Sequence, residues 1–273
     1  ANTSNADELW VAGGKASLLK SSDRGHSWQP IAPPAGIEEL QFRDVLAIGD
    51  HIYAMTVGQN GESRVYLSEN SGDNWQLDFT DADPSAFFDC IDVTDNGDIW
   101  LYGDSLNGEL FIRQKTATGW RKPQGNLSAL PQEGGFASSG TCLQTRGDTV
   151  FIGTGASAMP RFVVANQTSV QIHDSPLPQG EQAGIFSLQA EGQGVFVFGG
   201  NLQDDQATEN RAYYYDFKRW QPLAAPTITG AIYGSAWAED GDRTLLMVVS
   251  PKGASISRDR GISWQSASED NYW

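Results

Sequence analysis

Short apolar segments recur along the chain at regular intervals, and most of them follow a turn-forming group of Gly, Asn, Asp or Ser residues. Their aromatic and β-branched residues are typical of strands. One series of such segments comprises residues 9–13, 52–57, 99–103, 150–153, 195–199 and 245–249. A second segment precedes each of these except the first, and this series comprises residues 42–48, 87–93, 136–144, 185–190 and 232–238. The pattern predicts an all-β fold of many short strands.

A turn motif that ends in tryptophan occurs three times, each time after an apolar segment. Its pattern is Ser-x-Asp/Asn-x-Gly-x-Ser/Asn-Trp. Asp or Asn can accept backbone amides within a tight turn, Gly accommodates a positive φ, and Trp buries a large ring. We therefore interpret the motif residues as structural, and they are Ser21, Asp23, Gly25, Trp28, Ser68, Asn70, Gly72, Trp75, Ser257, Asp259, Gly261 and Trp264.

The spacing of the tryptophans predicts a β-propeller. Roughly 45 residues separate successive members of the series, which is a period typical of propeller blades, and the members are Trp28, Trp75, Trp120, Trp220 and Trp264. Two periods fit between the third and the fourth, so one blade has lost its tryptophan. We predict a single domain over residues 1–273, built from six four-stranded antiparallel blades, with seven blades as the alternative.

The two ends of the chain carry further expectations. Residues 1–7 are polar and predict a flexible N-terminal arm. The first blade has no apolar segment in the position of the inner strand. Because a propeller leaves only short, protected sheet edges, we expect residues 269–273 to supply that strand and close the ring.

The charge of the chain narrows the choice of partners. It contains 34 Asp and Glu residues against 18 Lys and Arg residues, for a net charge of −16. Proteins that bind nucleic acid carry a basic footprint, so we expect no nucleic-acid partner, and no apolar segment approaches the roughly 20 residues that span a bilayer.

The three histidines are scattered, and no dinucleotide fingerprint or Cys-x-x-Cys motif is present. We therefore expect a monomer without a metal or a cofactor.

The two cysteines, Cys90 and Cys142, lie in apolar segments. Because free cysteine is commonly buried, we expect two buried thiols, and a disulfide between neighbouring blades is the alternative. Two residues do not decide the redox compartment. We favour a periplasmic or secreted location over a cytoplasmic one.

Several segments at equivalent points of successive blades carry a family resemblance. They are Phe42-Arg43-Asp44-Val45, Ala86-Phe87-Phe88-Asp89, Phe136 to Cys142 and Gly184-Ile185-Phe186-Ser187, together with the turn motif at residues 257–264. The chain resembles the bacterial propellers grouped with the photosystem II stability and assembly factors, whose genomic relatives are often labelled oxidoreductases. The turn motif resembles the Asp-box, or BNR repeat, of the more distant sialidases. The resemblance implies a propeller whose plant and cyanobacterial members are assembly chaperones, and it implies no reaction.

The candidate binding residues are polar side chains on or beside the predicted inner strands, which line the central channel. They are Arg43, Asp44, Asp89, Ser138, Ser139, Thr141, Ser187 and Tyr233, with Glu181 and Ser235 beside them. An arginine next to a carboxylate could bind an anion, or both could pair with neighbouring strands and line a wet channel.

These residues favour a non-catalytic binding or assembly scaffold with a protein or peptide partner at the channel face. A carbohydrate-active propeller is the alternative, either a sialidase-like glycoside hydrolase or a glycan binder. A small-anion site around Arg43 is a third hypothesis. Sialidase chemistry requires a cluster of arginines for the substrate carboxylate, and only Arg43 lies clearly on an inner strand.

Overall fold

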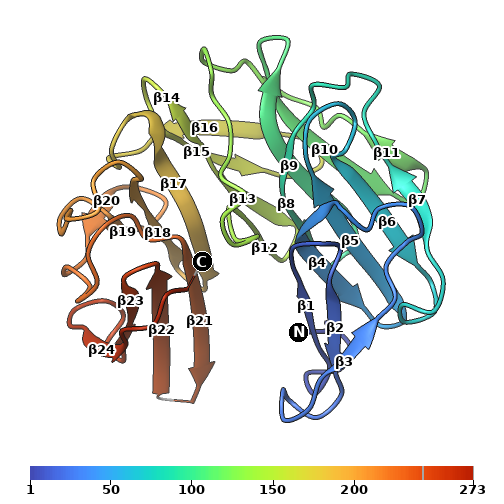
Figure 1. The fold of residues 1–273 in the computed structure, drawn as a ribbon. Coiled ribbons are helices and arrows are strands. Elements are labelled where there is room, and N and C mark those ends of the chain that lie inside the picture. Colours follow the sequence, from blue (N-terminus) through green and yellow to red (C-terminus); the bar gives the residue numbers. More distant parts are fainter. Residues whose placement is uncertain (242, 273) are drawn as a thin grey trace.

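The computed structural model describes residues 1–241 and 243–272, which form six antiparallel sheets arranged around a common axis (Figure 1). The first three sheets are β1(Leu9–Ala12)-β2(Leu18–Ser21)-β3(Gln29–Ile31), β4(Gln41–Ile48)-β5(His51–Val57)-β6(Arg64–Ser68)-β7(Gln76–Phe79) and β8(Phe88–Val93)-β9(Ile99–Leu106)-β10(Glu109–Thr116)-β11(Gly119–Arg121). The fourth is β12(Leu143–Arg146)-β13(Thr149–Gly153)-β15(Arg161–Ala165)-β16(Val170–Asp174). The fifth is β17(Gly180–Glu191)-β18(Gly194–Asn201)-β19(Ala212–Tyr215)-β20(Trp220–Pro222), and the sixth is β21(Gly234–Asp240)-β22(Arg243–Ser250)-β23(Gly253–Ser257)-β24(Gln265–Ser268).

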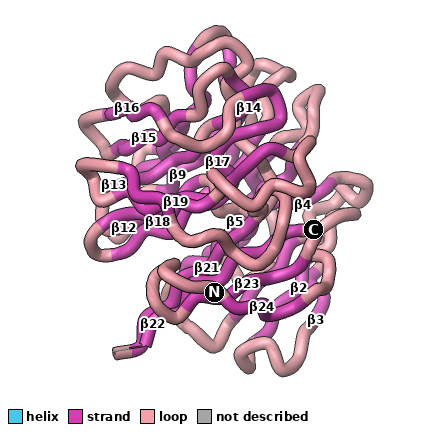
Figure 2. The backbone as a smooth tube through the Cα atoms, turned by 90° about the vertical axis from the view of Figure 1, so that its left-hand side faces the viewer, coloured by secondary structure: helices cyan, strands magenta, loops and turns pink. Residues whose placement is uncertain are grey.

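The predicted all-β, six-bladed propeller is confirmed. Figure 2 shows only strands and loops, and no helix occurs in the described part of the chain. In each of the last five sheets the first strand in sequence lies nearest the axis, and we call it the inner strand. The first sheet has three strands, and among the described residues no strand occupies its inner position, where the sequence predicts a strand from residues 269–273.

Two strand predictions need correction. The expected strand over residues 136–144 begins only at Leu143, because Gly140 has a φ of 66° and turns the chain out of an extended conformation. Residues 155–157 form an additional strand, β14(Gly155–Ser157), which pairs with the start of β17. The fourth blade therefore enters its sheet through an irregular segment, and that segment contributes to the site described below.

Neither end of the chain behaves as predicted. Residues 1–7 are not a detached arm, because the buried Asn2 side chain donates to Gly49 O at 2.8 Å and Thr3 N donates to Ala47 O at 3.0 Å. Residues 269–272 form no strand, and Tyr272 N donates to Ser250 O in the sixth sheet at 3.3 Å. The predicted ring-closing strand is therefore wrong for these residues, and Trp273 lies outside the described part.

The three tryptophan-ending turns share one set of hydrogen bonds. In each turn the glycine amide donates to the serine Oγ, at 2.8 Å in the first and second turns and 2.7 Å in the third. The amide two residues after the glycine donates to the Asp or Asn Oδ1, at 2.8, 2.9 and 2.9 Å. The Ser27 and Ser263 hydroxyls, followed by the amides of the same two residues, donate to the carboxylates of Asp23 and Asp259 and lower their pKa to about 2. The turns therefore depend on the residues that repeat in the sequence.

Hydrophobic packing joins each sheet to the next in sequence. The tryptophans of the turns contribute, because Trp75 packs between the second and first sheets and its Nε1 donates to Ala32 O at 2.9 Å. Trp220 packs in the same way against the fourth sheet, and its Nε1 donates to Asp174 O at 3.0 Å. Trp28 differs, because its side chain is 39% exposed. No preceding sheet lies close enough to cover it.

A disulfide links the third and fourth blades. Cys90 lies on β8 and Cys142 lies just before β12, with their Cα atoms 5.9 Å apart. Both residues are fully buried, as expected. The prediction of two free thiols is wrong and the alternative of a disulfide between neighbouring blades is correct, because the fold brings adjacent inner strands within the Cα separation that a disulfide requires.

The exposed fraction of Trp28 leads to a paired test of the turn tryptophans. Trp75→Ala removes a packed ring and an inter-blade hydrogen bond, so it should lower the free energy of unfolding by about 3 kcal/mol. Trp28→Ala should lower it by less than about 1 kcal/mol, as for other surface substitutions. Urea denaturation followed by fluorescence measures both values. Equal losses would contradict the assignment of Trp28 to an uncovered face.

Candidate functional site

Three inner strands carry a β-bulge close to the same end of the propeller. On β4 the pairing shifts between Phe42 and Asp44, which leaves Arg43 as the extra residue. The same shift leaves Asp89 extra on β8 and Phe186 extra on β17. A bulged residue leaves the regular ladder and its side chain is aimed in a new direction. The bulges therefore set Arg43, Asp89 and Phe186 apart from the residues that pair in the sheets.

The three bulged residues line one pocket of about 240 Å³. The pocket lies at the end of the propeller where most inner strands begin, which we call the channel face. Its other lining residues come from the ends of strands and from the loops that precede the inner strands, and they are Phe87, Asp104, Gly135, Phe136, Ala137, Ser138, Leu202 and Tyr233. Aromatic rings thus surround a few charged and polar groups, which is the usual composition of a ligand pocket.

Arg43 is the cationic group of this pocket. Its Nε is buried and has no hydrogen-bond partner among the described residues. Within that part of the chain, no carboxylate lies within ion-pair distance of its guanidinium. Arg43 as a whole is half-buried, so its guanidinium can be reached by an anionic or hydrogen-bond-accepting group from outside, which would satisfy the buried Nε.

Asp89 and Asp104 form the acidic side of the pocket. Asp89 is 1% exposed, and its Oδ2 has no hydrogen-bond partner among the described residues. Burial raises the pKa of Asp89 well above its usual range, and the adjacent Asp104 carboxyl raises it further, while the Gly135 and Ala137 amides and Arg43 oppose these effects. Burial also raises the pKa of Asp104 to about 6, although its Oδ1 accepts from Gly135 N at 3.2 Å. Close carboxyl groups titrate as a pair, so the two hold a proton into the neutral range.

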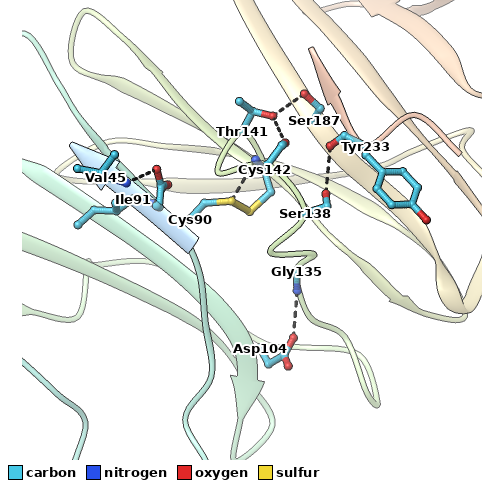
Figure 3. The surroundings of a disulfide bond; sticks show 12 residues. Val45, Cys90, Ile91, Asp104, Gly135, Ser138, Thr141, Cys142, Ser187 and Tyr233 are labelled. Carbon is cyan, nitrogen blue, oxygen red and sulfur yellow. Dashed lines mark hydrogen bonds between the residues drawn. A yellow bond between two sulfur atoms is a disulfide. The ribbon is translucent and has the colours of Figure 1, made fainter. Parts of the chain in front are cut away.

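Glycines allow this close approach. A Cβ on Gly135 would lie 2.4 Å from Asp89 Oδ2, and one on Gly134 would lie 1.9 Å from Asp104 Oδ1. Figure 3 shows the Asp104 carboxyl directed at Gly135, on the segment that also carries Ser138. Ser138 Oγ donates to Tyr233 O at 3.0 Å and connects the fourth-blade loop to the sixth blade. The loop therefore closes one wall of the pocket.

The remaining predicted site residues connect neighbouring blades. Asp44 Oδ2 accepts from Ile91 N at 3.0 Å, and burial raises the pKa of Asp44 to about 8. Thr141 and Ser187 share a hydrogen bond of 2.6 Å (Figure 3), and Ser187 and Ser235 share another of 2.6 Å. Ser139 Oγ lies 2.6 Å from Thr141 Oγ1. For Asp44 this arrangement matches the expectation of pairing with a neighbouring strand.

The structure thus brings Arg43, Asp89, Ser138 and Tyr233 together in the pocket. It places Asp44, Thr141 and Ser187 in the inter-blade contacts, and Ser139 bonds Thr141 within its own loop. Glu181 is exposed at the start of β17. Sequence reasoning missed Asp104 and the three phenylalanines of the pocket walls, Phe87, Phe136 and Phe186. The position of Phe186 could have been found, because it aligns with Arg43 and Asp89 in the repeated segments. Asp104 follows Gly103 at the end of an ordinary strand and gave no signal.

The described residues contain no group of three or more His, Cys, Asp or Glu side chains that could hold a metal ion. No helix in that part of the chain is long and apolar enough to cross a membrane.

The sheets and the pocket together define a six-bladed β-propeller with a charged and aromatic pocket on its channel face. The fold is similar to that of YCF48 bound to a D1 peptide, at 14% identity over 96% of this chain and 78% of that chain, with a TM-score of 0.62. YCF48 from Cyanidioschyzon merolae is also similar, at 13% identity over 97% and 83%, with a TM-score of 0.61. An ancestral GH74 enzyme matches at 15% identity over 97% of this chain and 40% of that chain, with a TM-score of 0.67. No protein-family profile and no curated protein matches the sequence.

Because burial raises the pKa of Asp89 and Asp104 in the folded state, the stability of the protein should depend on pH. The folded state holds the protons of Asp89 and Asp104 more tightly than the unfolded chain, whose aspartates titrate near about 3.9. The stability that these protons contribute is complete below that pH and is lost as the pH rises through about 6, the pKa of Asp104. The melting temperature should therefore fall between about pH 5 and pH 8.

Asp104→Asn keeps an oxygen for the Gly135 amide and removes the titrating group, so it should reduce the slope of melting temperature against pH. Asp148→Asn, an exposed residue on the turn between β12 and β13, serves as the control. Differential scanning calorimetry measures the slope. An unchanged slope in Asp104→Asn would contradict the proton-sharing pair.

Proposed function

We propose that this protein is a non-catalytic scaffold that binds a protein or peptide partner through the pocket on its channel face. One observation carries the proposal: the buried Nε of Arg43 has no hydrogen-bond partner among the described residues, and it lies in a pocket whose walls include Phe87, Phe136, Phe186 and Tyr233. Arginine and aromatic residues are the groups that dominate the binding energy of protein interfaces. An apolar side chain of the partner would fill the aromatic part, and an oxygen acceptor would bind Arg43.

The similarity in fold supports the proposal, because one of the similar structures is YCF48 bound to a D1 peptide.

We also propose that the three tryptophan-ending turns are Asp-boxes, which their shared hydrogen bonds support. The disulfide supports an oxidising location, periplasmic or secreted, because such compartments preserve disulfides. The net charge of −16 supports a monomer, since like charges repel at close approach.

Affinity capture from an extract of the source organism tests the proposal. Wild-type protein should retain a partner, and Arg43→Ala should retain at least about tenfold less, which corresponds to about 1.4 kcal/mol. Arg146→Ala is the matched control, because Arg146 is an exposed arginine at the end of β12 and does not line the pocket. Mass spectrometry identifies the retained protein, and calorimetry with its peptides measures the affinity. Equal retention by Arg43→Ala would exclude this pocket as the binding site.

A carbohydrate-active propeller is the second candidate, and the carboxyl pair is the observation that favours it. Two carboxyl groups in one cleft are the minimum that a glycoside hydrolase requires, and Asp89 and Asp104 share the pocket. If the protein is a scaffold, aryl glycosides should remain intact at every pH between about 4 and 8, which includes the pKa of about 6 of Asp104. Turnover that is lost in Asp104→Asn would instead identify a hydrolase.

A further inference from the structure

Two buried polar atoms without a hydrogen-bond partner belong to the pocket on the channel face. The described part of the chain contains five such side-chain atoms, and two of them, Arg43 Nε and Asp89 Oδ2, come from residues that line this one pocket. A buried polar group without a partner destabilises the folded state. Their coincidence therefore indicates that one group from outside satisfies both atoms.

Arg43 and Asp89 lie on adjacent inner strands. Asp44 Oδ2 on β4 accepts from Ile91 N on β8 at 3.0 Å, and the two bulged residues come just before this contact on their strands. Among the described residues, the Arg43 guanidinium and the Asp89 carboxyl form no ion pair with each other. A ligand group can therefore lie between them.

The surroundings of Asp89 favour its protonated form. Burial raises the pKa of Asp89, and the adjacent Asp104 carboxyl on β9 raises it further, although Arg43 and two backbone amides oppose these effects. A protonated carboxyl group donates one hydrogen bond. Asp89 and Arg43 can therefore both donate into the pocket, and a ligand that accepts two hydrogen bonds would fit them.

The other titratable groups near Asp89 do not compete for this role. Burial raises the pKa of Tyr102, on β9 beside Asp89, well above its usual range, and burial also raises the pKa of Tyr233 in the pocket wall, so both phenols stay neutral. Glu133, on the loop that precedes β12, already accepts from Arg161 Nε at 2.7 Å. The charge balance of the pocket thus rests on Arg43, Asp89 and Asp104.

We propose that the pocket binds a carboxylate group of the partner between Arg43 and Asp89, with Asp89 in its protonated form. Arg43 supplies the compensating positive charge and charge-assisted hydrogen bonds, and Asp89 donates from Oδ2. An ionised Asp89 would place a second negative charge against the ligand, so the carboxylate binds together with a proton. This inference rests on the proposed function, because it specifies the group that the partner inserts into the same pocket.

Isothermal titration calorimetry with two matched probes tests the proposal. Hydrocinnamate carries a carboxylate and a ring for the aromatic walls, and hydrocinnamide is its uncharged counterpart. Because Asp89 loses its proton as the pH rises, hydrocinnamate should bind at least about tenfold more tightly at about pH 6 than at about pH 9, with uptake of a proton. At the lower pH it should also bind at least about tenfold more tightly than hydrocinnamide.

Three variants separate the roles of the two carboxyl groups. Asp89→Asn keeps a donor and cannot titrate, so its affinity for hydrocinnamate should stay nearly constant over this pH range. Asp104→Asn keeps Asp89 intact and should shift the fall in affinity to lower pH, because the Asp104 carboxyl helps to raise the pKa of Asp89. Asp148→Asn, exposed on the turn between β12 and β13, is the control and should behave as wild type.

Two capped peptides identify the source of the carboxylate. Acetyl-phenylalanine presents it at a chain end, and acetyl-phenylalanyl-glutamate with an amidated end presents it on a side chain. Binding of either one that is lost in Arg43→Ala supports the proposal, and the tighter of the two shows which source the pocket prefers.

Several results would overturn the proposal. Hydrocinnamide could bind as tightly as hydrocinnamate, the wild-type affinity could be independent of pH, or Asp89→Asn could retain the full fall in affinity. Absence of binding by every probe would also exclude it. Failure of the proposed function looks different, because affinity capture would then retain no partner, whereas a partner that binds through Arg43 equally well at every pH would preserve the scaffold and exclude the proton-coupled carboxylate.

Discussion

The blades of this propeller are sheets with apolar faces, and the fold depends on packing each sheet against its neighbours in sequence. A short strand pair would be marginal alone, so the blades stabilise one another around the ring. The regular spacing of the tryptophans follows from this constraint. Each of Trp75 and Trp220 reaches back to the preceding blade with its ring and with its indole N–H.

The inner strands contribute to two features of the structure, the contacts between neighbouring blades and the pocket on the channel face. Residues in regular positions hold the blades together, as Asp44 does by accepting from the Ile91 amide and Ser187 does by bonding Thr141. Residues at the bulges, Arg43, Asp89 and Phe186, leave the ladder and line the pocket. Each bulged residue is the direct neighbour of a paired residue on the same strand, so one strand contributes both to the contacts between blades and to the pocket.

The fold could be predicted from the sequence because its period is local: each blade repeats the same turns and apolar segments. The sequence did not correctly predict the contacts between segments that lie far apart in the chain. The disulfide joins residues that are 52 positions apart, and only the packing of adjacent inner strands shows that they touch. The C-terminal residues failed as an inner strand because Tyr272 bonds within the sixth sheet. Four of the eight candidate binding residues line the pocket, and Asp104 was missed because its strand carries no polar pattern.

The bulges have a consequence for how such a protein changes over evolutionary time. A bulged residue makes no ladder hydrogen bond, so a mutation at position 43, 89 or 186 alters the pocket while the pairing of the strands persists. Arginine, aspartate and phenylalanine at three equivalent positions already illustrate how different the tolerated side chains are. Selection can therefore replace the chemistry of the channel face one residue at a time, which is consistent with a single architecture shared, at 13–15% identity, with a peptide-bound protein and with an enzyme.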